Sequence, residues 1–233
     1  MRLDQYLATS TELSRKDAKK AITKGRVRVD GSPVRSANLQ VTDKAVVELD
    51  GSELHLPGEI YLMMNKPDGV ISATTDSSQP TAVDLLPSQL ASKVHIAGRL
   101  DKDTTGLLLL TSDGQWSHQV TSPRRDCPKT YQVQLSEPLS SEARGKLETG
   151  VLLKDEDKPT LPASVVTCSE TTIELTISEG RYHQVKRMLA AVGNHVVGLH
   201  RLRIGEITLD PALAPGQYRE LTGDEIRSIF GSA

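Results

Sequence analysis

The sequence predicts an α+β fold, with a small N-terminal α/β module followed by a larger domain built on a mixed, largely antiparallel sheet. Two observations carry this prediction. Short apolar or alternating runs typical of strands outnumber the helical patterns and do not alternate regularly with them. Basic residues are also concentrated at the N-terminal end, which separates that end from the rest of the chain.

Length and composition favour a packed, soluble protein. The chain has 233 residues, of which 37% are hydrophobic and 25% charged, so it can bury a core and is not expected to be disordered. Its two cysteines suit neither a disulfide framework nor a zinc site. No apolar run approaches membrane-spanning length, and the first residues do not begin a secretory signal. We therefore expect a cytoplasmic protein without a membrane partner, acting as a monomer.

Residues 1–50 are predicted to form a basic module. Residues 1–44 contain ten Lys or Arg against five Asp or Glu, a net charge of +5, whereas the rest of the chain carries −7. A helix over residues 15–24 is expected to begin after a cap at Ser14, and the alternating run 26–29 predicts a half-buried strand. Because both elements present cations on their solvated sides, the phosphates of RNA or DNA are the expected partner.

The second domain is expected to cover residues 60–233, after a linker over residues 51–59 that contains two glycines and a proline. A buried strand is predicted at residues 60–64, and a helix with an i, i+3, i+4, i+7 apolar stripe begins near Val185. Further strands are predicted over residues 131–135, 172–178, 196–202 and 206–209.

The stretch over residues 96–116 is predicted to organise this second domain. Four consecutive leucines, 107–110, predict a short buried strand. Before it lies a glycine-bounded loop that carries Arg99, Asp101 and Asp103, and charged loops held against buried strands often present catalytic groups. A salt-bridged surface turn is the commoner origin of such a loop, and spacing alone does not choose between the two carboxylates.

A second basic cluster covers residues 181–203, with five Lys or Arg, three His and no acidic residue. Several of these cations crowd the start of a predicted helix, where the helix dipole disfavours positive charge unless an anion lies nearby. Phosphate, or the loop at Asp101, would supply that anion. The histidines lack neighbours at metal-ligand spacing, and no glycine-rich phosphate loop or dinucleotide motif is present. A reaction on an RNA-like polyanion, with no cofactor and no metal, is the simplest interpretation.

Two family resemblances add to this interpretation. The runs Arg2-Leu3-Asp4, Ser14-Arg15 and 25–31 resemble the small alpha-L RNA-binding module of ribosomal proteins and RNA-modifying enzymes. Over residues 60–222, the order of Asn65-Lys66-Pro67, Gly98-Arg99-Leu100-Asp101, Lys129-Thr130-Tyr131 and the run 177–188 resembles the pseudouridine synthase family. The runs 121–125, 181–188 and 190–197 are most similar to the branch that acts on small-subunit (16S) ribosomal RNA.

This resemblance implies an isomerase that breaks the N1–C1′ bond of a uridine, turns the uracil and rejoins it through C5, with no net redox change and no cofactor. The target uridine has to leave its stack first. By resemblance, Asp101 is the nucleophile or base, Tyr131 stacks on the uracil, and Lys186 pairs with the aspartate. Attack on the base and chemistry at the ribose both remain open. The expected RNA contacts are Arg2, Arg15, Lys16, Lys19, Arg26, Arg28, Arg99, Arg124, Arg125, Arg181 and His183.

Two other functions remain open on the sequence alone. One is a pseudouridine synthase for large-subunit ribosomal RNA, which only substrate assays separate. The other is a non-catalytic RNA-binding factor of ribosome assembly, which explains the basic module but leaves Asp101, Tyr131 and Lys186 without a joint role. The expected partner is therefore small-subunit ribosomal RNA or the assembling small ribosomal subunit.

Overall fold

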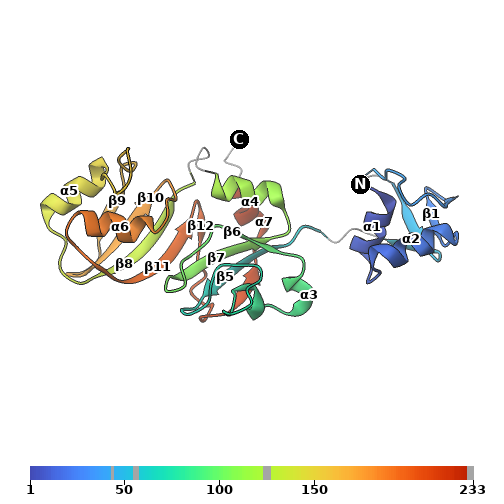
Figure 1. Ribbon diagram of the computed structural model, residues 1–233, viewed down its shortest axis with the longest axis horizontal. Helices are drawn as coiled ribbons and strands as arrows, with labels where there is room; N and C mark the ends of the chain where they lie inside the picture. The colour runs from blue at the N-terminus through green and yellow to red at the C-terminus, as the bar shows by residue number, and fades with distance from the viewer. Residues whose placement is uncertain (43–44, 55–57, 123–126, 230–233) are drawn as a thin grey trace. The chain divides into compact units, whose positions relative to one another are not determined.

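The computed structural model describes residues 1–42, 45–54, 58–122 and 127–229. The chain divides into two compact units, Met1–Gly58 and Glu59–Ala233. Figure 1 shows the elements of each unit in chain order. Within the described residues, no helix combines the length and the apolar composition that a membrane crossing requires.

The N-terminal unit packs two helices against a small antiparallel sheet of order β2-β1-β3-β4. Its elements are α1 (Leu3–Ser10), α2 (Arg15–Thr23), β1 (Val27–Val29), β2 (Ser32–Val34), β3 (Val47–Leu49) and β4 (Ser52–Leu54). The predicted cap is present, because the Ser14 side chain accepts a hydrogen bond from the Asp17 amide. Leu3, Leu7, Ile22 and Val47 are fully buried in its core.

The linker predicted over residues 51–59 is wrong in its first part. Ser52–Leu54 form β4, which pairs with β3 in register Val47↔Leu54. The hydroxyl of Tyr6 in α1 also donates to the Leu54 carbonyl at 3.0 Å. Gly51, one of the two glycines that suggested a linker, lies in the turn that joins β3 to β4 and has a φ of +83°.

The C-terminal unit, Glu59–Ala233, is built on one sheet of order β13-β5-β7-β11-β8-β10-β9, with β6 and β12 paired at its sides. The strands are β5 (Tyr61–Lys66), β6 (His95–Ala97), β7 (Thr105–Thr111), β8 (Lys129–Leu135), β9 (Ser164–Thr167), β10 (Thr172–Ile177), β11 (Val196–Ile204), β12 (Ile207–Thr208) and β13 (Tyr218–Glu220). Among the strand pairs of the described residues, β7–β11 alone is parallel. The predicted mixed, largely antiparallel α+β fold is confirmed.

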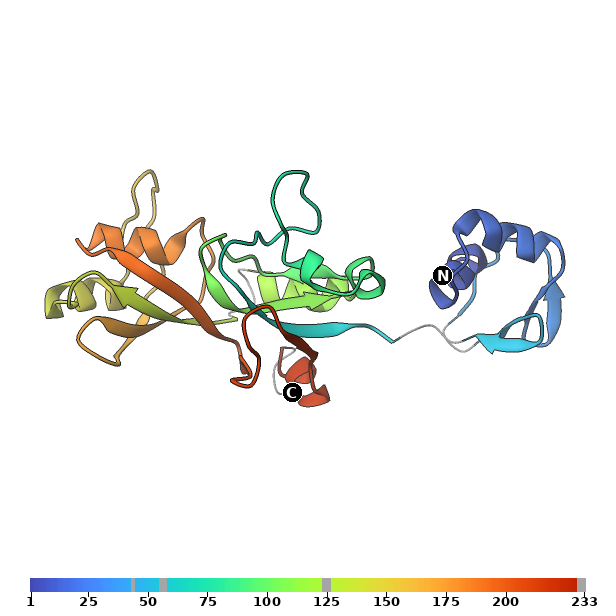
Figure 2. The same cartoon turned by 90° about the horizontal axis from the view of Figure 1, so that it is seen from below.

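Helices and short turns cover both faces of this sheet. They are η1 (Val83–Leu85), α3 (Ser88–Ala91), α4 (Gly114–Thr121), α5 (Ser141–Thr149), α6 (Gln184–Ala191) and α7 (Gly223–Ser228). Figure 2 shows the loop between β5 and η1, and the loop after α5, projecting on the side of the sheet where α6 lies. The face that carries α6 is also the face that carries the candidate site.

The four leucines of β7 explain why the predicted strand is apolar at every position. Leu108 and Leu110 enter the core that contains α6, whereas Leu107 and Leu109 enter the core around Trp116 of α4. Successive side chains of a strand point to opposite faces, so a strand buried on both faces has no polar positions to alternate. The strand thus holds the loop that precedes it against a fully packed sheet.

The parallel contact between β7 and β11 requires a glycine at one position. Gly106 has a φ of +98°, and a Cβ placed there would lie 2.4 Å from the Arg201 carbonyl oxygen and 2.7 Å from its amide nitrogen. No L side chain fits at such a distance, and glycine alone adopts this φ readily. The close approach brings Arg201 of β11 to the base of the 98–104 loop.

Candidate active site

A cleft of about 680 Å³ opens beside Asp101. Most of its lining comes from the loop between β6 and β7, from β8 and β11, and from the turn that joins β10 to α6, and the start of α6 adds Val185 and Lys186. The charged or aromatic residues of the lining are Arg99, Asp101, Lys102, Lys129, Tyr131, Glu179, Arg181, Tyr182, His183, Lys186 and Arg201. The three predicted catalytic residues, Asp101, Tyr131 and Lys186, all line this one cleft.

The Asp101 loop is held in place by buried polar side chains outside it. Ser72, 4% exposed, accepts from the Leu100 amide at 3.0 Å and donates to the Leu100 carbonyl at 2.8 Å. Within the loop, the Thr104 amide donates to the Asp101 carbonyl at 3.1 Å. Backbone groups on both sides of the aspartate are therefore satisfied, which limits its movement.

Lys66, at the end of β5, is the second support of this loop. Its side chain is fully buried and its Nζ donates to the carbonyls of Pro67, Lys102 and Thr104 at 2.9 to 3.1 Å. Burial disfavours the ammonium form and lowers the pKa of Lys66 to about 8, although the carboxylates of Asp68, Asp103 and Asp101 oppose this. Three carbonyls compensate a charge that would otherwise be costly to bury.

Arg201 is the third support and also contacts the predicted stacking residue. It is 2% exposed, and its guanidinium donates to the carbonyls of Leu107 at 2.8 Å, Gly98 at 2.9 Å and Arg99 at 3.4 Å. Its Cζ lies 6.0 Å from the centroid of the Tyr131 ring, within reach of a cation–π contact. Tyr131 is 9% exposed and comes from β8, which pairs with β11. One buried arginine therefore links the aspartate loop to the tyrosine.

The Asp101 carboxylate faces two basic side chains, His183 at the end of the β10–α6 turn and Lys186 in the first turn of α6. His183 Nε2 lies 3.3 Å from Oδ1, and Lys186 Nζ lies 3.7 Å from Oδ2. The Asp101 side chain is 32% exposed, so it stays accessible from the cleft. The expected pairing of Lys186 with Asp101 is present, and His183, expected only as an RNA contact, is the nearer of the two basic side chains to the carboxylate.

Asp103, the second carboxylate of the loop, also binds Lys186. Lys186 Nζ donates to Asp103 Oδ1 at 2.6 Å and to Oδ2 at 2.8 Å. This hydrogen bond is the main reason that the pKa of Asp103 is lowered. The lysine is therefore shared between two carboxylates, and its closer contact is with the more exposed one.

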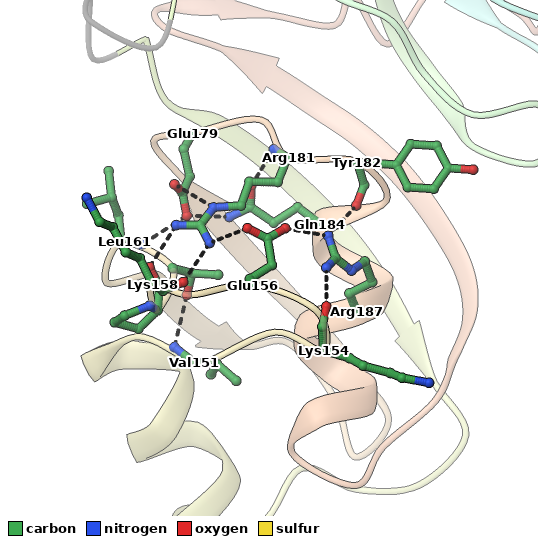
Figure 3. A network of polar contacts seen from close by, with 12 residues as sticks. Val151, Lys154, Glu156, Lys158, Leu161, Glu179, Arg181, Tyr182, Gln184 and Arg187 are labelled. Atoms are coloured by element: carbon green, nitrogen blue, oxygen red, sulfur yellow. Dashed lines mark hydrogen bonds and ion pairs between the residues drawn. The ribbon is translucent and has the colours of Figure 1, made fainter.

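The cations at the start of α6 are balanced by carboxylates, as the helix dipole requires. Figure 3 shows Glu156 between the guanidinium groups of Arg181 and Arg187. Its oxygens lie 3.2 Å from Arg181 Nη1 and 2.9 Å from Arg187 Nη1, and Glu179 accepts from Arg181 Nε at 3.1 Å. Arg181 also donates to the carbonyls of Lys158 and Pro159. The hydrogen-bond donors of the Arg181 guanidinium are directed at protein acceptors, which argues against its expected role as an RNA contact.

In the N-terminal unit, a buried carboxylate gathers three of the predicted RNA-binding cations. Asp4 is fully buried, and it lies 3.0 Å from Arg2 Nε and 3.8 Å from both Arg15 Nη2 and Lys19 Nζ. The hydrogen bond from Arg2 is the main cause that lowers the pKa of Asp4. All three cations keep more than two-fifths of their side chains exposed, so the group presents net positive charge to solvent.

The other predicted RNA contacts fall into three groups. Lys16 and Arg28 are exposed on the N-terminal unit, whereas Arg26 on the same unit is paired with Asp50. Arg99 is exposed on the rim of the cleft beside Asp101. Arg124 and Arg125 lie outside the described residues.

Comparison with known proteins decides the family. Residues 60–191 match RNA pseudouridylate synthase, and residues 1–47 match the S4 domain. The chain belongs to the RNA pseudouridylate synthase family. Family membership confirms the predicted enzyme class and the predicted RNA-binding module at the N-terminus; the roles of the individual residues remain predictions.

Relatives of known name match over the whole chain. The chain is 48% identical over 230 residues to the ribosomal small subunit pseudouridine synthase A of Vibrio cholerae, covering 99% of this chain and 100% of the relative. It is 50% identical over 230 residues to the protein of the same name from Escherichia coli, covering 98% and 100%. A crystal structure of a pseudouridylate synthase superimposes with a TM-score of 0.72 at 44% identity, covering 98% of this chain and 99% of that one.

Sequence reasoning missed the three supports of the Asp101 loop, although two of them left a signal. Lys66 lies directly after an apolar run that predicts a buried strand, so its ammonium needs a partner inside the protein. Arg201 lies two residues after Leu199 in β11, so the two side chains point to the same face of the strand, and both are buried. Ser72 left none, because a serine in a polar loop has no preferred location.

Proposed function

We propose that this family member converts a uridine of small-subunit ribosomal RNA to pseudouridine, with Asp101 as the catalytic carboxylate. The two relatives named above carry that substrate in their names. The observation that carries the residue assignment is the position of Asp101 on a rigidly supported loop at the cleft, facing Lys186 and His183. The reaction is expected in the cytoplasm, on the RNA or on the assembling subunit.

The residues divide the chemistry between them. Asp101 acts on the flipped nucleotide as nucleophile or base while the N1–C1′ bond breaks. The uracil turns against the face of Tyr131, and C1′ then bonds to C5. The C5 proton leaves and N1 gains a proton, so atoms and charge balance without a redox partner. Lys186 and His183 hold the Asp101 carboxylate in its orientation at the start of the reaction.

The S4 unit holds the RNA in this proposal. Its exposed cations, Arg2, Arg15, Lys16, Lys19 and Arg28, suit phosphate contacts that do not depend on sequence. The catalytic cleft then adds the contacts that select the uridine.

The test replaces each carboxylate of the loop in turn. Asp101→Asn is nearly isosteric, so the loop should hold and the RNA should bind, but an amide is neither a carboxylate nucleophile nor a base. Pseudouridine formation on unmodified small-subunit RNA or particles should fall by at least roughly 100-fold. New pseudouridines are mapped in the RNA of both subunits after incubation with each protein.

Asp103→Asn is the matched control. It lies two residues away and removes a carboxylate that also contacts Lys186. Substantial activity should remain, because Lys186 still reaches Asp101. Pseudouridine made by Asp101→Asn, or complete loss of activity in folded Asp103→Asn, would contradict the assignment. Modification of large-subunit RNA alone by the wild type would contradict the substrate.

A further inference from the structure

Tyr182 is an exposed aromatic side chain in a protein that has few. The chain contains one Trp, five Tyr and one Phe. Tyr182 is 77% exposed, the most of the large hydrophobic side chains in the described residues, whereas Tyr131 and Trp116 are buried. Single exposed apolar side chains are common on protein surfaces, so the position of the ring, and not its exposure alone, has to carry any assignment.

The ring is held rigidly despite its exposure. It stacks on the imidazole of His183, with centroids 3.8 Å apart and planes at 22°. His183 has a left-handed backbone with a φ of 46°, which turns the chain sharply at this point. The Tyr182 carbonyl accepts from Arg187 Nη1 at 3.2 Å, and the Arg181 amide donates to Gln184 Oε1 at 2.8 Å. Backbone groups on both sides of the ring are therefore fixed.

Tyr182 also stands at the cleft where the reaction is proposed. It lines the same cleft as Asp101, and the imidazole on which it stacks contacts the Asp101 carboxylate at 3.3 Å. Figure 3 shows its ring projecting away from the Glu156 network on which the turn rests. The ring is thus a flat, pre-positioned surface at the rim, while buried Tyr131 lies deeper.

We infer that Tyr182 is a stacking platform for an unpaired nucleobase of the substrate RNA, next to the uridine that enters the cleft. Flipping one nucleotide leaves its neighbours without a stacking partner, and an exposed aromatic face replaces that partner for any base. Because His183 already immobilises the ring, little side-chain entropy is lost on binding. The inference rests on the proposed function and adds a binding site for a flanking nucleotide.

The experiment is a double-substitution cycle between protein and RNA. The modified uridine is first mapped with wild-type protein on the RNA of both subunits, and an RNA fragment is made around it. Each nucleotide within three positions of that uridine is replaced, one at a time, by an abasic nucleotide. The dissociation constant is measured for wild type, Tyr182→Phe, Tyr182→Leu and Tyr182→Ala, with Val197→Ala as a control that shortens another exposed apolar side chain.

One flanking position should respond to the tyrosine. Removing that base should weaken binding to wild type and to Tyr182→Phe by roughly five- to hundredfold, the range of one base–aromatic stack. The same removal should have little further effect in Tyr182→Ala and Tyr182→Leu, because no ring remains to lose the base. Val197→Ala should behave as wild type, and all variants should unfold at nearly the wild-type temperature.

Two results would overturn the inference. In the first, abasic substitutions at every flanking position affect wild type and Tyr182→Ala equally. In the second, Tyr182→Ala binds and modifies the RNA fragment normally but loses activity on particles that contain ribosomal proteins, which would assign the ring to a protein contact. Failure of the small-subunit proposal shows separately, in the initial mapping, and the fragment then follows the uridine that the wild type does modify.

Discussion

The cations of the two units are used in opposite ways. In the N-terminal unit, the side chains of Arg2, Arg15 and Lys19 are 42%, 59% and 55% exposed around one buried carboxylate. In the C-terminal unit, Lys66 is fully buried and Arg201 is 2% exposed, and both donate to backbone carbonyls. The first group leaves its charge open to solvent, and the second holds a loop from inside the protein.

The difference teaches that a basic cluster in a sequence has two possible meanings. Exposed cations around a shared carboxylate keep net charge and unused donors. Cations surrounded by carbonyls and carboxylates use their hydrogen-bond donors within the protein. Arg181 and Arg187, for example, both donate to the Glu156 carboxylate. The tests below start where removing a cation should have the largest effect.

Arg201→Leu should have the largest effect, because it removes the buried guanidinium that donates to the carbonyls of Gly98, Arg99 and Leu107. We expect the free energy of unfolding to fall by about 3 kcal/mol. Pseudouridine formation should fall by about 100-fold even in the folded fraction, since the Asp101 loop and Tyr131 lose their common support. Thermal unfolding and single-turnover rates measure the two effects.

Arg203→Leu is the control for that variant, because Arg203 lies two residues further along β11 and is exposed. Its stability should stay within about 0.5 kcal/mol of wild type. Equal losses in the two variants would show that charge on the strand, and not the buried contacts, is what matters.

Lys66 should make stability depend on pH in a defined direction. Its folded-state pKa of about 8 lies below the ordinary 10.5, so between these values the unfolded chain binds the proton more tightly. The free energy of unfolding of wild type, minus that of Lys66→Met, should therefore rise as pH increases through this window, by at most about 3 kcal/mol. Denaturant unfolding of both proteins from pH 7 to 10.5 measures it.

Lys19→Met is the control for loss of a lysine charge that the fold does not bury, because the Lys19 side chain is 55% exposed. A flat pH dependence of the difference between wild type and Lys66→Met would mean that burial does not disfavour the ammonium form of Lys66.

Removing residues 1–58 should affect binding and leave the chemistry intact. The C-terminal unit has its own hydrophobic cores and should remain folded. RNA affinity should fall by roughly tenfold at physiological salt, and the slope of log affinity against log salt should become shallower by roughly two to three, because phosphate contacts are lost. Binding titrations at several salt concentrations measure this. Unchanged affinity and slope would remove the S4 unit from the proposed RNA interface.

Local patterns in the sequence were sufficient for the α+β class, the capped helix after Ser14 and the buried strand at the four leucines. These features depend on contacts between near neighbours and on the period of apolar residues. Asp101, Tyr131 and Lys186 were proposed as catalytic from the family resemblance, since a charged loop alone is more often a surface turn. The first part of the expected linker was misread because glycine-rich turns and linkers share a composition.

Tertiary structure alone decided which partner each charge has. Lys66, Arg201 and Asp101 are far apart in the sequence, and they meet because β5, β7 and β11 lie side by side in the sheet. Likewise, His183 reaches Asp101 only because the β10–α6 turn folds over the loop after β6. Sequence records that a side chain carries a charge, but the free energy of that charge depends on its burial and on the groups within a few ångströms, which only the folded chain brings together.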